Sequence, residues 1–321
     1  MQQDISIQGV KPEKGSPFDM HGCLDVSGVD LIDASGQPYR LHGISTHGLQ
    51  WYPEYVNEAT FRFLRDEWGV NAIRLAMYTA EDGYCDGDNP LAFEQIIRTG
   101  VVTARHLGMY VIIDWHILKD NDPDLYREDA LDFFGRVSAE YSGAGNVLYE
   151  ICNEPNGYGI DWEHVRSYAE DVIPVIRRNE PDAIILVGTP TWSQDVDAVA
   201  VHPVTASDNV MYTLHFYSGT HKQELRDKLL RARSDGTPVM ISEFSITDAS
   251  GSGPLDLNSA REWKELILKE NLSCFAWSLS NRKESSALLV PECHVLSGFE
   301  DEDLTPAGRW MRDFMRELNA R

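Results

Sequence analysis

Short apolar runs alternate along the chain with stretches whose apolar residues recur at helical spacing. The runs at residues 110–113 and 183–187 are almost continuously apolar, as strands are when both faces of a parallel sheet are covered. We expect eight strands, near residues 40–46, 70–76, 109–115, 146–152, 183–188, 209–215, 237–242 and 272–278. Helical spacing predicts helices at 59–68, 91–107, 161–179, 221–234, 259–270 and 306–318, and a weaker one at 195–200.

This alternation predicts a fold. Eight strand–helix units indicate a parallel sheet, and eight parallel strands close into a (β/α)8 barrel, which commonly takes about 250 residues plus insertions. Residues 29–33 and 39–41 flank a turn at 34–37 and predict a β-hairpin that caps the bottom of the barrel. Residues 1–20 are polar without a period and are interpreted as a loosely attached arm or linker, and residues 21–321 as one domain.

Charge and composition narrow the class of partner. The chain has 51 Asp and Glu against 28 Lys and Arg, a net charge of −23. Such a surface repels phosphate backbones and anionic lipids, so neither nucleic acid nor a membrane is expected as a partner; a neutral polymer is compatible with it, and so is a simple role in solubility. No run reaches the about 18 to 20 apolar residues of a membrane span. The N-terminal sequence predicts no signal peptide in this chain.

Polar and aromatic residues follow every predicted strand. Barrel enzymes carry their active sites at the C-terminal ends of the strands. Packing alone would favour valine, isoleucine and leucine at these positions. In chain order the residues are His47 and Trp51, Arg74 and Tyr78, His116, Asn153 and Glu154, Trp192, His215 and Tyr217, Glu243, and Trp277 with Arg282 and Glu284.

Two carboxylates stand out in this set. Glu154 ends the fourth predicted strand and Glu243 ends the seventh, so barrel closure would place them across the mouth from each other. Glycoside hydrolysis needs such a pair, one group to protonate the leaving oxygen and one to attack or stabilise the anomeric carbon. A glutamate at a strand end can also simply cap the next helix. The neighbouring Asn153, which can donate to a sugar hydroxyl, and Pro155, which fixes the turn, favour a site.

Seven segments, in order, resemble motifs of glycoside hydrolase family 5, most closely the bacterial endoglucanases of subfamily 2. Residues 147–157 (VLYEICNEPNG) resemble the acid/base motif, and residues 241–251 (ISEFSITDASG) the nucleophile segment. The other segments are HGLQW at 47–51, NAIRLAMY at 71–78, VIIDWH at 111–116, YTLHFYSGTH at 212–221 and FAWSLSNRKESSALL at 275–289. Together the matches extend over residues 40–290.

The resemblance implies a retaining endo-β-1,4-glucanase, with residues 21–321 as its catalytic domain. Glu154 would be the general acid/base and Glu243 the nucleophile. Arg74 would lower the pKa of Glu243, since an opposite charge favours the ionised carboxylate, and Tyr217 would donate a hydrogen bond to it. Retention implies carboxyl groups about 5 to 5.5 Å apart.

The resemblance also implies roles for the remaining residues. Asn153 would bind the 2-hydroxyl of the sugar that is cut, His116 and His215 would complete the polar floor, and Trp192 would serve the leaving side. The sugar subsites on the non-reducing side would be lined by His47, Trp51, Tyr78, Ala249, Trp277 and Glu284. The partner would be a β-glucan polysaccharide or oligosaccharide. A polymeric substrate implies secretion, and the protein is expected to be a monomer or one module of a larger cellulase.

Four residues, which make three departures, differ from the family pattern. Phe244 and Ser245 stand where relatives often carry Trp-Gly, and Cys152 stands where they often carry alanine; both changes should only adjust packing. Arg282 replaces a common lysine at a sugar contact, and the two side chains differ in donor geometry. Mixed-linkage β-glucan, xyloglucan, mannan and xylan therefore stay open as substrates.

Two other classes of protein fit the sequence less well. A non-catalytic carbohydrate-binding barrel is disfavoured because both acids are intact, together with Arg74 and Asn153. A metal-dependent hydrolase or a phosphosugar enzyme is disfavoured because the sequence has no H-x-H at the first strand, no H-E-x-x-H and no glycine-rich phosphate loop. The five cysteines have no C-x-x-C spacing. No metal and no cofactor is expected.

Overall fold

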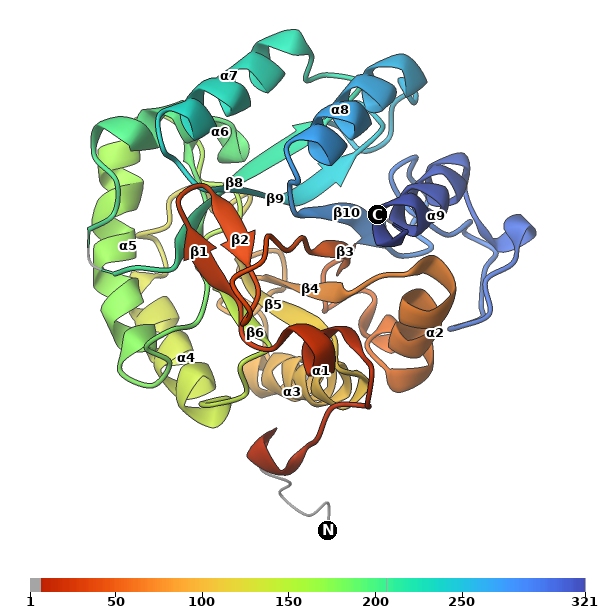
Figure 1. Ribbon diagram of the computed structural model, residues 1–321, viewed down its shortest axis with the longest axis horizontal. Coiled ribbons are helices and arrows are strands. Elements are labelled where there is room, and N and C mark those ends of the chain that lie inside the picture. Colours follow the sequence, from red (N-terminus) through yellow and green to blue (C-terminus); the bar gives the residue numbers. More distant parts are fainter. Residues whose placement is uncertain (1–6, 206, 321) are drawn as a thin grey trace.

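Eight parallel strands close into a barrel in the computed structural model, which describes residues 7–205 and 207–320 (Figure 1). The strands follow one another around the barrel in chain order, and β10 pairs with β3 to close it. They are β3 (His42–Thr46), β4 (Ala72–Tyr78), β5 (Tyr110–His116), β6 (Val147–Glu150), β7 (Ile185–Val187), β8 (Val210–Tyr217), β9 (Val239–Ser245) and β10 (Cys274–Leu279). The predicted (β/α)8 barrel is confirmed.

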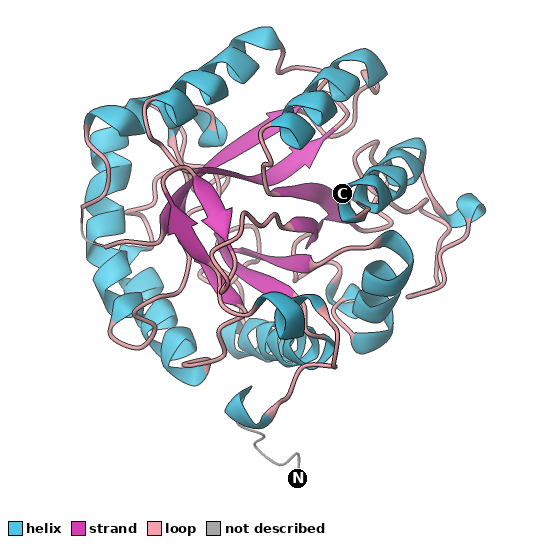
Figure 2. Cartoon of the chain, viewed as in Figure 1, coloured by secondary structure: helices cyan, strands magenta, loops and turns pink. Residues whose placement is uncertain are grey.

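Helices surround the strands on the outside (Figure 2). The long ones are α2 (Glu58–Trp68), α3 (Pro90–Leu107), α4 (Arg127–Glu140), α5 (Trp162–Arg177), α7 (Gln223–Ser234), α8 (Leu257–Lys269) and α9 (Pro306–Asn319). The short ones are η1 (Ile7–Gly9), α1 (Pro17–His21), η2 (Pro53–Tyr55), α6 (Pro190–Ser193), η3 (Val196–Val201) and η4 (Asp301–Asp303). The weak helix expected at 195–200 is the 3₁₀ helix η3, whose β-branched valines disfavour an α-helix. None of the described helices has the length and apolarity that crossing a bilayer requires.

The lower half of the barrel is filled by large apolar side chains. Tyr110, Leu148, Met240 and Phe275 meet there and are fully or almost fully buried. Phe275 needs a glycine opposite it, because a Cβ at Gly43 would lie 2.2 Å from its ring. The interior is thus a packed core, and only the end at which the strands terminate is left for polar groups.

A hairpin closes the base of this core. It consists of β1 (Asp25–Ser27) and β2 (Asp30–Ile32), and its Leu24 and Leu31 pack with the interior side chains. The predicted cap is confirmed, but the predicted second strand at 39–41 is wrong: those residues form no strand, and the isolated bridge next to them joins Ile32 to Pro38. Proline has no N–H for a ladder, whereas Gly28, with φ 61°, permits the tight turn between β1 and β2.

Residues 7–20, interpreted as a loosely attached arm, are packed against the barrel instead. Phe18 is buried, with the Arg105 guanidinium 4.5 Å from its ring centre. Glu13 forms ion pairs of 2.7 Å with both Arg62 and Arg65 on α2. Residues 1–6 of the predicted arm lie outside the described residues.

Candidate active site

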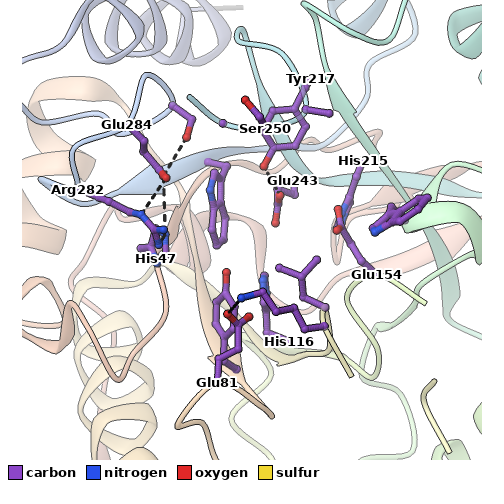
Figure 3. A pocket seen from close by; sticks show the side chains of 18 of the residues that line it. His47, Glu81, His116, Glu154, His215, Tyr217, Glu243, Ser250, Arg282 and Glu284 are labelled. Atoms are coloured by element: carbon purple, nitrogen blue, oxygen red, sulfur yellow. Dashed lines mark hydrogen bonds and ion pairs between the residues drawn. The ribbon is translucent and has the colours of Figure 1, made fainter. Parts of the chain in front are cut away.

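A cleft of about 570 Å³ opens at the C-terminal ends of the strands (Figure 3). Every residue predicted for the site lines this cleft except two. The exceptions, Arg74 and Asn153, are completely buried beneath the floor of the cleft, where Arg74 donates a hydrogen bond to Asn153. Barrel closure therefore brings together the residues at the strand exits, as the sequence predicts.

The two candidate catalytic carboxylates face each other in the cleft (Figure 3). A carboxylate oxygen of Glu154, one of Glu243 and a ring nitrogen of His215 all lie within 4.8 Å of one another. Both residues line the cavity, and 8% of the surface of Glu154 and 4% of that of Glu243 is exposed. A closest approach of no more than 4.8 Å between their oxygens is compatible with the about 5 to 5.5 Å between the carboxyl groups of retaining glycosidases and falls well below the about 6.5 to 9.5 Å of inverting ones.

Glu243 lies within β9 and both of its oxygens are held. The Tyr217 hydroxyl donates to Oε1 at 2.6 Å, and Arg74 Nη1 donates to Oε2 at 3.2 Å. Burial raises the pKa of Glu243, and the nearby charge of Glu154 adds to this, while His215, Arg74 and Tyr217 lower it. The contribution of Arg74 has the predicted sign, although burial has the largest effect and the net shift of the Glu243 pKa is upward.

Glu154 follows β6 and is held by a histidine. His215 Nδ1 lies 2.8 Å from Glu154 Oε1, and its Nε2 lies 2.9 Å from Ser242 Oγ. Because Ser242 Oγ donates its proton to Glu150 at 2.7 Å, it can only accept from His215, which then donates from both ring nitrogens. Burial disfavours this charged ring, but hydrogen bonds to Glu150 and Glu154 outweigh it and raise the pKa of His215 to about 9.

Arg74 connects the two sides from below. Its guanidinium donates to Glu150 at 2.7 and 3.2 Å, and to Asn153 Oδ1 at 2.6 Å. It also lies 3.0 Å from Asp114. Burial would raise the pKa of Glu150, but the charges of Arg74 and His215 lower it to about 2. One buried cation thus faces several acids, and removing it would leave them uncompensated.

Glu150 was not predicted as a site residue. Its signal in the sequence is a charged residue inside an apolar strand, four positions before Glu154. Asp114 and Ser242 were missed in the same way and also lie fully buried beneath the floor. Such residues build the site without lining it.

His116 orients Asn153. Its Nδ1 lies 2.6 Å from Asp114 Oδ2, and its Nε2 lies 3.4 Å from the Asn153 amide nitrogen. Burial lowers the pKa of His116 far below its ordinary value, so the ring is neutral. A neutral ring that donates to Asp114 through Nδ1 accepts at Nε2, which turns the Asn153 amide donor toward it. The predicted polar floor is therefore an ordered hydrogen-bond network.

The predicted sugar-binding residues divide between opposite sides of the barrel. His47 lies with its ring 5.0 Å from that of Trp277, and Arg282 bridges it to Glu284, with contacts of 3.1 Å and 3.0 Å (Figure 3). Trp192 follows β7, which is four strands away from β3 around the barrel, and is 47% exposed. The cleft residues that the sequence did not predict are Glu81, Leu118, Lys119, Gln194, His221, Ser250, Gly251 and Ser286.

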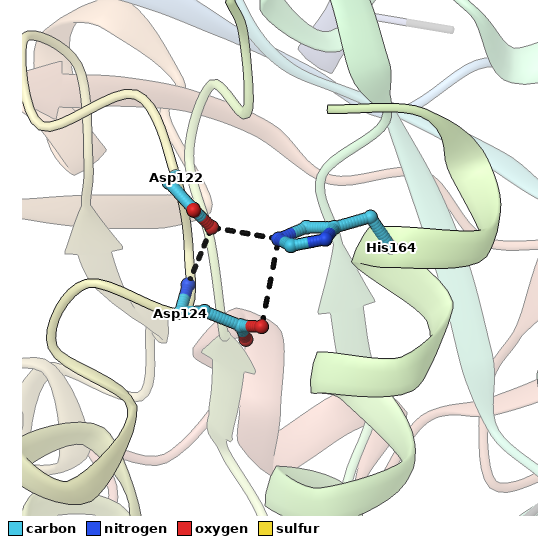
Figure 4. A group of neighbouring side chains, drawn as sticks. All are labelled: Asp122, Asp124 and His164. Atoms are coloured by element: carbon cyan, nitrogen blue, oxygen red, sulfur yellow. Dashed lines mark hydrogen bonds and ion pairs between the residues drawn. The ribbon is translucent and has the colours of Figure 1, made fainter. Parts of the chain in front are cut away.

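Among the described residues, two groups of side chains have a composition that could hold a metal. Asp122, Asp124 and His164 cluster at the surface (Figure 4), but Arg127 already donates to Asp124 at 2.6 and 2.9 Å. The other group is Glu154, His215 and Glu243, in which a doubly protonated imidazole has no lone pair to offer. Neither group presents an unengaged ligand set, and the absence of a metal stays a prediction.

Comparison with known proteins gives one consistent result. The family model described as Cellulase (glycosyl hydrolase family 5) matches residues 32–283. The chain is 48% identical over 302 residues to Endoglucanase A of Butyrivibrio fibrisolvens, which covers 93% of this chain and 70% of that protein. It is 47% identical over 292 residues to an endoglucanase of Clostridium saccharobutylicum, covering 91% of this chain and 64% of that protein. The chain thus spans about two thirds of the length of these relatives.

Solved structures agree with this result. The structure of Cellulase Cel5C_n superposes with a TM-score of 0.90 at 40% identity, covering 95% of both chains. The catalytic domain of the Thermobifida fusca endoglucanase Cel5A superposes with a TM-score of 0.89 at 34% identity, covering 94% of this chain and 100% of that chain.

Proposed function

The chain belongs to glycosyl hydrolase family 5, a family of retaining glycosidases, and from that membership we propose that it is an endo-β-1,4-glucanase that cuts internal bonds of cellulose. The observation that carries the proposal is the carboxylate pair, Glu154 and Glu243, with oxygens within 4.8 Å on the two sides of one cleft. Relatives at 46 to 48% identity that are named endoglucanases support the choice of reaction.

The proposed reaction has two steps. In the first, Glu154 gives its proton to the glycosidic oxygen while the bond from that oxygen to C1 breaks, and a Glu243 oxygen bonds to C1. In the second, Glu154 takes a proton from water, the water oxygen attacks C1, and Glu243 is released as a carboxylate. Tyr217 and Arg74 hold the attacking carboxylate, and Asn153 lies buried next to them with its amide nitrogen 3.4 Å from His116 Nε2. Two inversions at C1 retain the configuration.

The cleft wall supports a glucan as the substrate. Trp51, Tyr78 and Trp277 offer flat apolar rings with polar edges, which suit the C–H faces and hydroxyl rims of pyranoses. A panel of carboxymethylcellulose, barley β-glucan, mannan and xylan tests the preference by the release of reducing ends. We expect the highest rate on the first, with a rapid loss of viscosity. A dominant rate on another polymer would reassign the substrate, and no release from any would support a non-catalytic carbohydrate-binding barrel.

Retention is tested separately by proton NMR of the first product. We expect the β-anomer to appear before mutarotation, and the α-anomer would contradict the proposed steps. Glu154→Gln and Glu243→Gln serve as controls that keep the cleft but lose turnover. Activity that a chelator abolishes would instead support a metal-dependent hydrolase.

We also propose where the protein works and in what form. Cellulose is an insoluble polymer, so the enzyme would act outside the cell, as a monomer or as one module of a larger cellulase. Because the chain spans 64% of the Clostridium saccharobutylicum endoglucanase, relatives exist that carry more sequence than this barrel. Immunodetection in culture supernatant against a cytoplasmic marker, and light scattering of the purified chain, test these two points.

A further inference from the structure

The segment that carries the proposed acid lies outside the barrel ladder. β6 ends at Glu150, and the N–H of Ile151 is the next to reach β7, at 2.9 Å from the Leu186 carbonyl. The N–H groups of Asn153 and Glu154 then donate to the carbonyls of Trp115 and Ile117, at the end of β5, at 3.1 and 3.3 Å. The Glu154 carbonyl accepts from Asn156 Nδ2 at 2.8 Å, so the carbonyls that need partners from outside the segment are those of Asn153 and Pro155.

Those partners come from a turn after β7. The Ser193 hydroxyl donates to the Asn153 carbonyl at 2.6 Å, and the Trp192 N–H donates to the Pro155 carbonyl at 3.1 Å. The two bonded carbonyls flank Glu154 on both sides. The approach is close, because a Cβ at Gly188 would lie 2.1 Å from the Cys152 carbonyl oxygen.

The turn has an unusual backbone. Thr191, Trp192 and Ser193 have φ angles of 59°, 55° and 56°, so three successive residues other than glycine are left-handed. This conformation is disfavoured for residues with a Cβ, above all for a β-branched one, and persists where surrounding contacts determine it. Strain of this kind is concentrated at sites that need a fixed geometry.

Ser193 supplies the contacts that hold the turn in place. It is fully buried, and its Oγ accepts from Thr213 Oγ1 at 2.9 Å and from the Thr189 N–H at 3.3 Å while it donates to Asn153. One donor and two lone pairs are thus all engaged, which fixes the direction of the hydroxyl. Thr189, Thr213 and Asn153 are also fully buried, so water cannot substitute for a lost partner.

We infer that the left-handed turn formed by Thr191, Trp192 and Ser193 braces the catalytic acid, and that Ser193 is a positioning residue for Glu154. Ser193 acts through the backbone of Asn153 and touches no substrate. The same turn carries Trp192 into the cleft, so one rigid element sets both the acid and an aromatic wall. This inference rests on the proposed function.

Leaving-group dependence tests the inference. In phenyl β-cellobioside the phenol leaves only when Glu154 protonates its oxygen. In 2,4-dinitrophenyl β-cellobioside the leaving group departs as the stable dinitrophenolate anion and needs no proton. We expect Ser193→Ala to lower kcat/KM for the phenyl substrate about tenfold to a hundredfold, and for the dinitrophenyl substrate less than about threefold. Because kcat/KM reports the first chemical step, the later role of Glu154 as a base does not enter.

Ser138→Ala is the matched control. Ser138 is equally buried, on α4 outside the cleft, and its hydroxyl accepts a hydrogen bond from Asn179 Nδ2 at 2.9 Å. The variant should therefore leave both rates unchanged. If Ser193→Ala does not fold, Ser193→Gly relieves the left-handed backbone and removes the same hydroxyl, and it should show the same selective loss. An equal loss on both substrates, or no loss on either, would overturn the inference. A wild-type chain that cleaves neither cellobioside would instead refute the proposed function.

Discussion

The two catalytic carboxylates are similar in chemistry and in burial, but the protein holds them in different ways. Glu243 lies inside a strand, opposite His215 in the β8–β9 ladder, and Arg74 and Tyr217 bind its two oxygens. Glu154 lies beyond the end of its strand, and its contact is the imidazolium of His215. A nucleophile has to attack from one fixed position, whereas an acid has to give up a proton and take it back. The difference in construction matches this difference in role.

The first test of this difference is to replace each acid by its neutral amide. Glu243→Gln should lower kcat by about ten-thousandfold or more on every substrate, because the attacking group itself is lost. Glu154→Gln should lower kcat/KM by about 10² to 10⁴ for phenyl β-cellobioside, but far less for the dinitrophenyl substrate. Equal losses on both substrates in both variants would mean that the roles are not divided in this way.

The second test removes the cation beneath the nucleophile. Arg74→Met would leave Asp114, Glu150 and Glu243 without their buried counter-charge, and we expect it to lower the free energy of unfolding by about 3 to 5 kcal/mol. Urea denaturation near pH 7 measures this. Arg62→Met is the control, because Arg62 is a half-exposed ion-pair residue on α2 and should cost less than about 1 kcal/mol. Similar losses in the two variants would contradict the role of Arg74.

The third test uses pH on the acid side. The pKa of His215 is raised from 6.5 to about 9 in the folded protein, so its stabilising effect is complete below about pH 6.5 and is lost as pH rises through 9. The free energy of unfolding of the wild type relative to His215→Asn should therefore fall by roughly 3 kcal/mol across that range. Urea midpoints at several pH values measure the difference. A difference that does not change with pH would show that the ring is neutral.

The smallest of these effects is expected at Tyr217. Tyr217→Phe removes one hydrogen bond to Glu243, and the loss of a bond to a charged group should lower kcat about tenfold. Because that hydroxyl lowers the pKa of Glu243, the acidic limb of the kcat/KM profile should also move to higher pH. An unchanged limb would mean that Tyr217 does not hold the ionised nucleophile.

The same contrast explains what the sequence could predict. Strand exits are visible in a sequence because apolar runs end there, so residues such as His47, His116 and Glu243 were found. Glu150 lies inside such a run, and only barrel closure shows that it faces Arg74. The hairpin strand at 25–27 was not predicted, because the hairpin forms around the tight turn at Gly28 and not around the longer turn at 34–37.

The turn after β7 gives no signal at all in the sequence. Left-handed residues are usually glycine or asparagine, but this turn consists of Thr191, Trp192 and Ser193. Its conformation comes from tertiary contacts with the acid segment, which local propensity does not contain. Arg282 is different again: its position was predicted, but its bridge between His47 and Glu284 depends on the loop after β10.

Trapping the covalent intermediate shows directly whether Glu243 is the nucleophile. Incubation with 2,4-dinitrophenyl 2-deoxy-2-fluoro-β-cellobioside, followed by intact mass and peptide mapping, identifies the residue that bonds to C1. We expect one fluorocellobiosyl adduct per chain, on Glu243, formed also by Glu154→Gln but not by Glu243→Gln. An adduct on a different residue, or turnover of natural substrate by a chain that never forms one, would contradict it.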